Sequence, residues 1–438
     1  MTKINTNLNK AIAGIPIQTH EGAPAKRITP EQQLNRSVLA CMLWEDSFYE
    51  SGESIANRIV EGVKNVSPEY ASQLAITARS KFYLRHVPLL ICDTLAKEGE
   101  LKAAVLAEVI QRPDELGEFL AIYWRNGKQP LAAQVKKGLA KAFTKFNEYS
   151  LAKYNSRKAG VKLRDVMFLC HPKPTSEEQA SLWKRLVDGK MISPETWENQ
   201  LSAGKDKKEA WTNLILENKL GGLALLRNLR NIQEVGVTEE IIRQGIQQAN
   251  FAKVLPFRFI AAARYAARFE PEIEKAMLKS LDTTVKLAGK TILLIDTSGS
   301  MVGGLSKKSD LNRSEAAIAL AILLREICSD IEIISFAGQP NQVPARRGFA
   351  LRDAIDPPTG GTNTEDAKKF ADSHGYDRII IITDEQSHQV ISNPRGLGYV
   401  INVAAYKNGV GYGKWTHIDG WSEAVINYIQ ELEAGSAE

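Results

Sequence analysis

The sequence predicts a multidomain protein in which an all-α helical array precedes a doubly wound α/β domain. The chain has 438 residues, more than one hydrophobic core usually holds. Helical patterns fill the first 289 residues, whereas strands and helices alternate after about Lys290. Residues 1–290 carry 43 Lys and Arg against 32 Asp and Glu, and residues 291–438 carry 13 against 19. We therefore expect an N-terminal segment at 1–28, a helical domain at 29–289 and an α/β domain at 290–438.

The helical half is predicted from apolar residues spaced three or four apart, with almost no strand signal. No fixed repeat period is visible in this half of the sequence. The clearest predicted helices are Glu31 to Met42, Pro68 to Ser80, Pro88 to Glu98, Leu101 to Gln111 and Phe257 to Phe269.

The second half alternates short apolar runs with helical patterns, which indicates a parallel sheet covered on both faces. The predicted strands are Thr291 to Ile295, Ile331 to Phe336, Arg378 to Thr383 and Tyr399 to Ala405. Helices are predicted at Ser314 to Cys328 and Trp421 to Leu432, with Gly411 to Thr416 as a loop before the last helix.

Oxygen-bearing side chains follow two of the predicted strands, at the sheet edge where open α/β sheets bind ligands. Hydroxyls and carboxylates suit a hard divalent cation, so we expect Mg²⁺ first, with Mn²⁺ or Ca²⁺ as alternatives. Only two of the five predicted ligands are acids, so the ion would be undercompensated. It could then accept a carboxylate or phosphate from a partner. The predicted metal ligands are Asp296, Ser298, Ser300, Thr362 and Asp384.

Two other interpretations of this segment are open. Asp296, Ser298 and Ser300 could simply cap the start of the following helix, although capping does not explain Thr362 and Asp384. An acid at a strand end also resembles the nucleophile loop of haloacid-dehalogenase-type phosphatases. Those enzymes place a second Asp two positions later, where this chain has Ser298.

The five residues resemble the metal-ion-dependent adhesion site of the von Willebrand factor A domain. That motif is Asp-x-Ser-x-Ser followed by a distant Thr and a distant Asp, and all five positions match. The resemblance implies a Rossmann-like α/β domain with a metal site at its top edge.

Positive charge in the helical half concentrates between Lys136 and Arg164, where nine Lys and Arg accompany one acid, Glu148. Such a segment favours a polyanionic partner, although a solvated lysine face without a ligand is the alternative. Helix geometry places three lysines opposite the apolar stripe from Val135 to Phe146. The candidate RNA-binding residues chosen on this charge geometry are Lys137, Lys141 and Lys145.

The helical half also resembles the TROVE module of the Ro autoantigen proteins. The resemblance rests on Lys153 to Lys158, Leu163 to Val166, His171 to Pro174, Leu225 to Ile232 and Val254 to Phe259. Bacterial members, the Ro sixty-kilodalton-related proteins, join a TROVE module to a von Willebrand factor A domain, so the resemblance covers nearly the whole chain. Carried over by motif, the further candidate RNA-binding residues are Lys153, Arg157, Lys158 and His171.

The resemblance implies a ring of HEAT-like helical repeats and a non-enzymatic RNA-binding function. In the family, small noncoding Y RNA binds the outer basic surface, and single-stranded ends of misfolded noncoding RNA enter the central cavity. It also implies RNA quality control or decay within a ribonucleoprotein, with polynucleotide phosphorylase, an exoribonuclease, joined through Y RNA. A monomeric ring is expected. The alternative from another class is a metal-dependent protein-binding adaptor.

Cysteine and targeting signals indicate a cytoplasmic protein. Cys41, Cys92, Cys170 and Cys328 are widely separated, as is usual in a reducing compartment, and no spacing predicts a structural zinc site. The first 30 residues lack the basic start and apolar stretch of a secretory signal, and no membrane-spanning segment is predicted.

Overall fold

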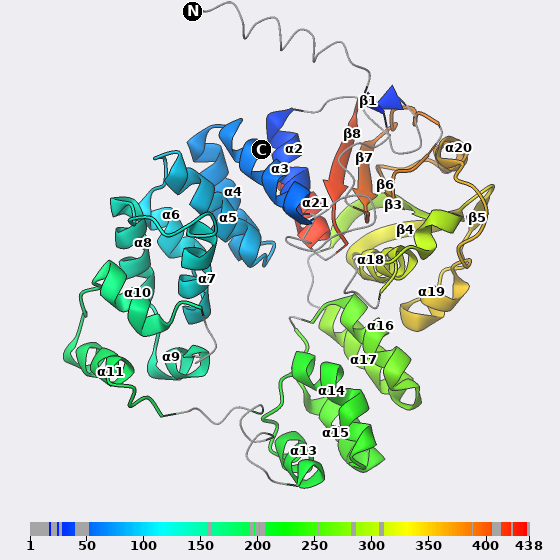
Figure 1. Cartoon of the computed structure of the whole chain (residues 1–438). Helices are drawn as coiled ribbons and strands as arrows, with labels where there is room; N and C mark the ends of the chain where they lie inside the picture. Colours follow the sequence, from blue (N-terminus) through cyan, green and yellow to red (C-terminus); the bar gives the residue numbers. More distant parts are fainter. Residues whose placement is uncertain are drawn as a thin grey trace, which may run out of the picture. The chain divides into compact units, whose positions relative to one another are not determined.

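The computed structural model describes residues 17–18, 24–25, 29–39, 52–155, 160–192, 197, 201, 206–252, 254–281, 286–305, 311–387, 389–404, 413–421 and 424–435. The chain divides into two units, and each is described by itself (Figure 1). Met1–Ser54, Leu255–Ala261 and Met277–Glu438 form the sheet unit. Ile55–Val254 and Ala262–Ala276 form the helical unit.

The sheet unit is built around a six-stranded sheet of order β5-β4-β3-β6-β7-β8. All neighbouring pairs are parallel except β4 and β5, which are antiparallel. A separate antiparallel pair consists of β1 (Ile17–Gln18) and β2 (Pro24–Ala25). The strands of the large sheet are β3 (Leu287–Asp296), β4 (Cys328–Phe336), β5 (Pro340–Gln342), β6 (Arg378–Thr383), β7 (Leu397–Asn402) and β8 (Trp415–Asp419).

Helices cover both faces of this sheet. Alternate residues of a strand point to opposite sides, so each face presents side chains for a helix to pack against. Ile379 and Ile381 share one buried cluster with Ala367 and Ala371 of α20. Arg378 points to the other face, where its Nε donates to Glu433 of α21 at 2.6 Å. The helices of this unit are α2 (Pro30–Leu39), α18 (Arg313–Ile327), α19 (Gly348–Ala354), α20 (Thr364–His374) and α21 (Ala424–Gly435).

The N-terminal helix α2 packs beside the edge strand β8. Gly420, directly after β8, has a φ of +133° and no side chain, and both properties are needed there. A Cβ atom at this position would lie 2.3 Å from the carbonyl oxygen of Leu39, at the end of α2. The close approach of α2 to the residue after β8 therefore requires glycine at this position.

The helical unit consists of successive helices that pack against near neighbours in the sequence, including α4 with α5 and α6 with α8. Its helices are α3 (Gly52–Lys64), α4 (Pro68–Ser80), α5 (His86–Lys97), α6 (Ala103–Val109), α7 (Pro113–Tyr123), α8 (Ala133–Phe143), α9 (Glu148–Tyr154), α10 (Leu163–Cys170), α11 (Glu177–Val187), α13 (Lys207–Leu216), α14 (Gly222–Glu234) and α15 (Glu239–Gln248). Helices α3, α16 (Pro256–Tyr265) and α17 (Glu270–Leu281) contribute residues to both units.

Local sequence explains where these helices begin. Ser67 caps α4 by accepting a hydrogen bond from the Tyr70 amide, and Pro68 occupies the first turn, where no amide donor is needed. Between helices, the fully buried Glu115 of α7 pairs with Arg79 of α4 at 2.7 Å. Glu115 also accepts the Gln111 and Arg112 amides, so the carboxylate joins two helices and caps one.

The expected fold class is confirmed, with differences at single elements. The predicted helix Pro68 to Ser80 matches α4, and the strand predicted at Arg378 to Thr383 matches β6. The loop expected at Gly411 to Thr416 is wrong at Trp415 and Thr416, which begin β8 and pair with Gly398 and Tyr399. This strand has only five residues and does not alternate strictly between apolar and polar side chains, so it gives no clear strand signal. The last helix begins at Ala424 rather than Trp421.

Candidate functional sites

The two predicted acids lie together because their strands are neighbours. Ile295 of β3 pairs with Ile382 of β6 in parallel register. Asp296 ends β3, Asp384 directly follows β6, and both side chains are fully buried. The carboxyl edge of the sheet therefore holds two acids side by side, as the sequence predicted.

Asp296 is held by hydrogen bonds to both of its oxygens. Oδ1 accepts the Ser298 amide at 2.8 Å, and Oδ2 accepts the Thr383 hydroxyl at 2.6 Å. Burial, and next the neighbouring charge of Asp384, raise the pKa of Asp296 from the ordinary 3.8 to about 6. The buried Asp296 beside a second buried acid calls for a compensating positive charge.

The predicted hydroxyl ligands fit a small divalent cation. Ser298 Oγ and Ser300 Oγ lie 3.2 Å apart. Two ligands at right angles on an octahedral Mg²⁺, each about 2.1 Å from the ion, are separated by about 3.0 Å. The loop that carries Thr362 is tied to the same segment, because Gly360 accepts the Gly299 amide at 3.1 Å. Thr362 itself is buried.

Helix capping does not account for these residues. The helix that follows, α18, is capped by Asn312, whose Oδ1 accepts the Glu315 amide at 2.8 Å. Ser298 precedes only the short 3₁₀ turn Gly299–Val302 and makes no side-chain cap hydrogen bond to it. The capping interpretation of Asp296, Ser298 and Ser300 therefore lacks structural support, while their role as metal ligands stays a prediction.

Arg313 is a charged neighbour of this site that the sequence did not reveal. It begins α18, is almost fully buried, and its Nη1 donates to Asp384 Oδ2 at 2.9 Å and to the Ser300 carbonyl at 3.0 Å. A Cβ atom at Gly303 would lie 3.0 Å from the guanidinium carbon, so glycine leaves room for it. The only local sequence signal for this role is that a basic residue stands at the start of a helix, where acidic residues are favoured.

A second buried charge cluster lies beside the predicted metal ligands and joins α2 to the sheet. Arg36 donates to Glu385 at 2.8 Å and to Asp419 at 2.7 Å, and all three side chains are buried. His417 Nδ1 lies 2.5 Å from the other oxygen of Glu385. Burial alone would raise the pKa of Glu385, but the charges of Arg36 and His417 outweigh burial and lower it. The Glu385 amide also donates to Thr383, the residue bonded to Asp296.

The predicted basic face of α8 is present, with one difference. Lys137 and Lys141 are exposed, opposite the buried Val135 and Leu139. Lys145 lies beyond the end of α8, and its ammonium donates to the carbonyls of Ala107 and Ile110 at the end of α6. Its ammonium therefore caps the end of α6, while the residue as a whole stays exposed. Burial lowers the pKa of Lys145.

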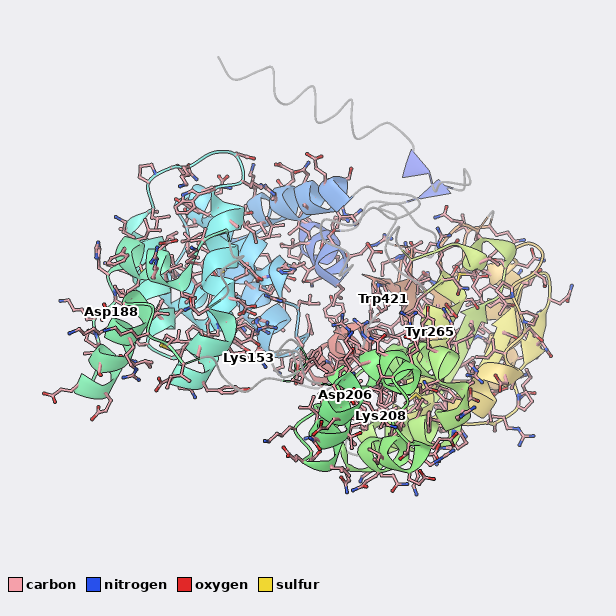
Figure 2. The ribbon with its side chains drawn as sticks, turned by 60° about the horizontal axis from the view of Figure 1, so that its bottom comes forward. Lys153, Asp188, Asp206, Lys208, Tyr265 and Trp421 are labelled. Carbon is pink, nitrogen blue, oxygen red and sulfur yellow. The ribbon has the colours of Figure 1, made fainter. Side chains whose placement is uncertain are left out.

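Of the residues assigned by motif, the structure describes two. Arg157 and Lys158 lie outside the described residues. His171 is exposed and ends α10 in the left-handed conformation with a φ of 47°. Lys153 is exposed on α9, labelled in Figure 2. Its Nζ lies 6.0 Å and 5.7 Å from the ring centroids of Tyr149 and Tyr154, and no described carboxylate pairs with it.

Lys153 also lines a pocket of about 920 Å³ formed mainly by α9, α14 and the segment after α15, which we call the α9–α14 pocket. Gly222, at the start of α14, is essential to its shape. A Cβ atom there would lie 2.5 Å from the Asn250 carbonyl and 2.6 Å from the Phe251 ring. The lining residues are Tyr149, Lys153, Trp197, Lys219, Gly221, Gly222, Leu223, Ala224, Arg227, Asn228, Asn231, Asn250, Ala252 and Val254.

Two further features are absent from the described ranges. No group of three or more His, Cys, Asp and Glu side chains there is arranged to hold a metal ion. Within the same residues, no helix combines the length and apolar character needed to cross a membrane.

Comparison with known proteins shows what the chain resembles. The TROVE domain family matches residues 184–319. The chain is 22% identical over 344 residues to telomerase protein component 1 of Rattus norvegicus, covering 56% of this chain and 13% of that protein. It is 33% identical over 90 residues to telomerase protein component 1 of Mus musculus, covering 19% of this chain and 3% of that protein. The chain thus spans a small part of these relatives.

A solved structure has a fold similar to that of this chain. The crystal structure of the RO (RSR) protein of Deinococcus radiodurans matches with a TM-score of 0.61 and 17% identity, covering 93% of this chain and all of that chain. The chain is thus similar to the TROVE domain over residues 184–319, and its fold is similar to that of the Deinococcus radiodurans protein over most of its length. The TROVE match and the similar fold agree with the resemblance to the Ro autoantigen proteins that the motifs predicted.

Proposed function

We propose that this protein is the RNA-binding component of a Ro and Y RNA ribonucleoprotein, and that it binds without catalysing a reaction. The TROVE match supports this class. The observation that carries the proposal is Lys153, an exposed cation beside two tyrosine rings, with no described carboxylate to neutralise it. A cation next to aromatic rings offers both phosphate attraction and base stacking.

Y RNA would bind an outer basic surface, and single-stranded ends of misfolded noncoding RNA would enter the cavity of a monomeric helical ring in the cytoplasm. Phosphate contacts would supply affinity, while folded duplex ends would be too wide to enter. Polynucleotide phosphorylase would join through Y RNA for quality control or decay. The outer surface would comprise Lys137, Lys141, Lys153, Arg157, Lys158 and His171, with Lys145 as an adjoining charge.

A divalent cation, Mg²⁺ first, would be held by Asp296, Ser298, Ser300, Thr362 and Asp384. The 3.2 Å separation of the two serine hydroxyls and the raised pKa of Asp296 support this assignment. When bound, the ion supplies a positive centre that accepts a carboxylate or phosphate oxygen from a partner. A phosphatase would need an acid at the position of Ser298. Because this chain has serine there, metal binding explains this edge of the sheet better than catalysis does.

Salt-dependent RNA binding tests the proposal. The probe is a small structured RNA with a single-stranded 3′ tail, and the variants are Lys153→Glu and the control Lys208→Glu. Lys208 lies in the first turn of α13, where an acid is well tolerated. We expect Lys153→Glu to weaken binding several-fold and make it less steeply salt-dependent, while Lys208→Glu binds like wild type. Equal binding by all three proteins would count against the Lys153 surface.

The alternative function is a metal-dependent protein-binding adaptor, favoured by the two buried acids at the sheet edge. In that case, Asp296→Ala would abolish capture of a protein partner and leave RNA affinity unchanged. Wild-type protein that retains no RNA but captures a partner only with Mg²⁺ would favour this alternative.

A further inference from the structure

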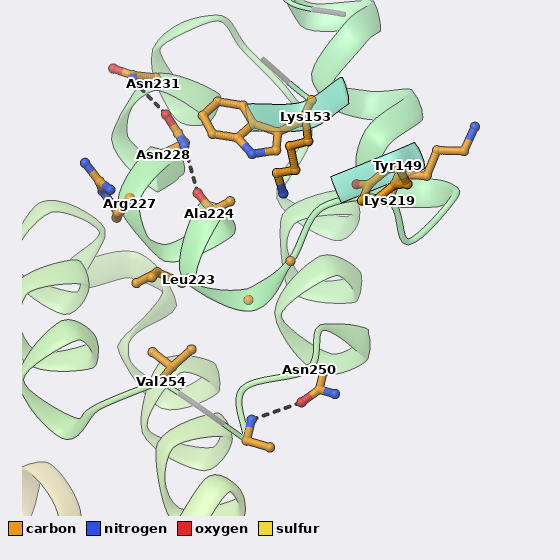
Figure 3. Close-up of a pocket in the computed structure, with 14 residues that line it drawn as sticks. Tyr149, Lys153, Lys219, Leu223, Ala224, Arg227, Asn228, Asn231, Asn250 and Val254 are labelled. Atoms are coloured by element: carbon orange, nitrogen blue, oxygen red, sulfur yellow. Dashed lines mark hydrogen bonds between the residues drawn. The ribbon is translucent and has the colours of Figure 1, made fainter. Parts of the chain in front are cut away.

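We propose that the α9–α14 pocket binds an unstacked nucleotide of single-stranded RNA. This inference rests on the proposed RNA-binding function and assigns it a specific site. The pocket is large enough, since about 920 Å³ lies near the upper end of small-ligand sites, roughly 300–1,000 Å³. Figure 3 shows Lys153 and Tyr149 with the α14 side chains that line the same space.

The charge of the lining selects an anion. Lys153, Lys219 and Arg227 contribute three cations from separate segments, and no acid is among the described lining residues. Lys219 pairs with Glu217 at 2.8 Å, but Lys153 and Arg227 have no described carboxylate partner. A polyanionic chain that enters the pocket therefore meets two uncompensated positive charges.

The aromatic lining suits a base. Trp197 is half-buried and stacks on Trp211, with centroids 5.9 Å apart and planes 25° apart. Trp211 is buried within α13, so the indole of Trp197 is supported from within the protein. Tyr149 is 56% exposed and brings a second ring to the pocket. Supported aromatic rings stack on any base, which favours binding without strong sequence preference.

Carboxamides supply hydrogen-bonding groups for a base edge. Asn228 is positioned by its bond to the Ala224 carbonyl at 2.8 Å, and it accepts a bond from Asn231 Nδ2 at 3.4 Å. These two bonds leave Asn231 Oδ1 as an acceptor at the pocket. Asn250 uses its Oδ1 to accept the Ala252 amide at 3.0 Å, which leaves its Nδ2 as a donor. A folded duplex hides these base edges, so the pocket favours single strands.

The test uses the full-length protein and a fluorescein-labelled, six-nucleotide single-stranded oligoadenylate, with anisotropy measured across salt concentrations. The pocket variant is Arg227→Gln. Its matched control is Arg230→Gln, which removes one charge from the same helix. Arg230 is outside the pocket and lies near Glu234 and Tyr265. Circular dichroism checks that each variant folds.

We expect Arg227→Gln to bind about fivefold more weakly at roughly 0.1 M salt, with a salt slope smaller by about 0.7, as for one lost phosphate contact on a single strand. Trp197→Ala should bind about tenfold more weakly with its slope unchanged, because stacking is not ionic. Arg230→Gln should match wild type. The hexanucleotide in a complementary duplex, or adenosine monophosphate alone, should compete poorly.

Equal binding by Arg227→Gln and Arg230→Gln would overturn the pocket assignment, and so would equal affinity for single strand and duplex. Tight binding of adenosine monophosphate alone would assign the pocket to a free nucleotide and also overturn it. The same preparations are tested with the structured RNA. If wild type binds that RNA but the pocket variants bind the hexanucleotide normally, only the pocket fails. If wild type binds neither RNA, the proposed function fails too.

Discussion

Arg313 donates a hydrogen bond of 2.9 Å to Asp384, and both side chains are buried. The guanidinium therefore neutralises one of the two acids that the sequence predicts as metal ligands. It also bonds to the carbonyl of Ser300, another predicted ligand residue. A divalent cation and Arg313 would thus act as competing counter-charges for the same carboxylate.

Removing that resident charge should strengthen metal binding. We expect Arg313→Gln to bind Mg²⁺ or Mn²⁺ about tenfold more tightly, because a nearby positive charge repels the ion. Without metal, the variant should be less stable by about 3 kcal/mol or more, since Asp384 loses its buried partner. Titration calorimetry and thermal denaturation measure the two effects. The control is Arg325→Gln on the same helix, and weaker metal binding by Arg313→Gln would contradict this account.

Asp296 should make the stability of the metal-free protein depend on pH. Its pKa of about 6 in the folded state exceeds the ordinary 3.8, so the folded state retains a proton that the unfolded state releases. The contribution of Asp296 to the free energy of unfolding is therefore greatest below about pH 4 and falls by up to about 3 kcal/mol as pH rises past 6. Thermal denaturation from pH 4 to 7 should show this loss in wild type and not in Asp296→Asn. Parallel curves for the two proteins would refute the assignment.

The buried pairs of Arg36 should hold α2 onto the sheet. Arg36→Met removes the guanidinium that bonds to both Glu385 and Asp419, and we expect a loss of about 3–5 kcal/mol in the free energy of unfolding. That is a large share of the roughly 5–15 kcal/mol of a typical domain. Chemical denaturation measures it, with Glu31→Met on the exposed side of α2 as control. A change below about 1 kcal/mol for Arg36→Met would show that the cluster is not required for stability.

Two lysines close in sequence should have different roles. Lys145→Ala removes the hydrogen bonds to Ala107 and Ile110, so we expect a loss of about 1.5–3 kcal/mol in the free energy of unfolding. Lys141 is exposed, and Lys141→Ala should alter stability by less than about 0.5 kcal/mol while weakening structured RNA binding. Urea denaturation of both variants measures the stability effect, and RNA titration of both variants measures the binding effect. A large loss of stability in Lys141→Ala together with a negligible loss in Lys145→Ala would contradict these two roles.

Local sequence patterns predicted the parallel sheet and the five metal-ligand candidates on three segments, because strand ends and hydroxyl motifs are local signals. They did not reveal Arg313, whose partner Asp384 lies 71 residues away. Arg36 and Glu385 are 349 residues apart, and neither shows in its own segment that it is paired. The same limit applies to the pocket, where α9 meets α14 through tertiary packing rather than through any shared motif.

The most direct test of the central claim is to purify the tagged protein from its native cell at moderate salt and sequence the RNA that stays bound. Lys153→Glu and the control Lys208→Glu are purified in parallel. We predict that wild type and the control recover one abundant small structured RNA, and that Lys153→Glu loses it. Recovery of no RNA above background by the wild-type protein would contradict the ribonucleoprotein assignment.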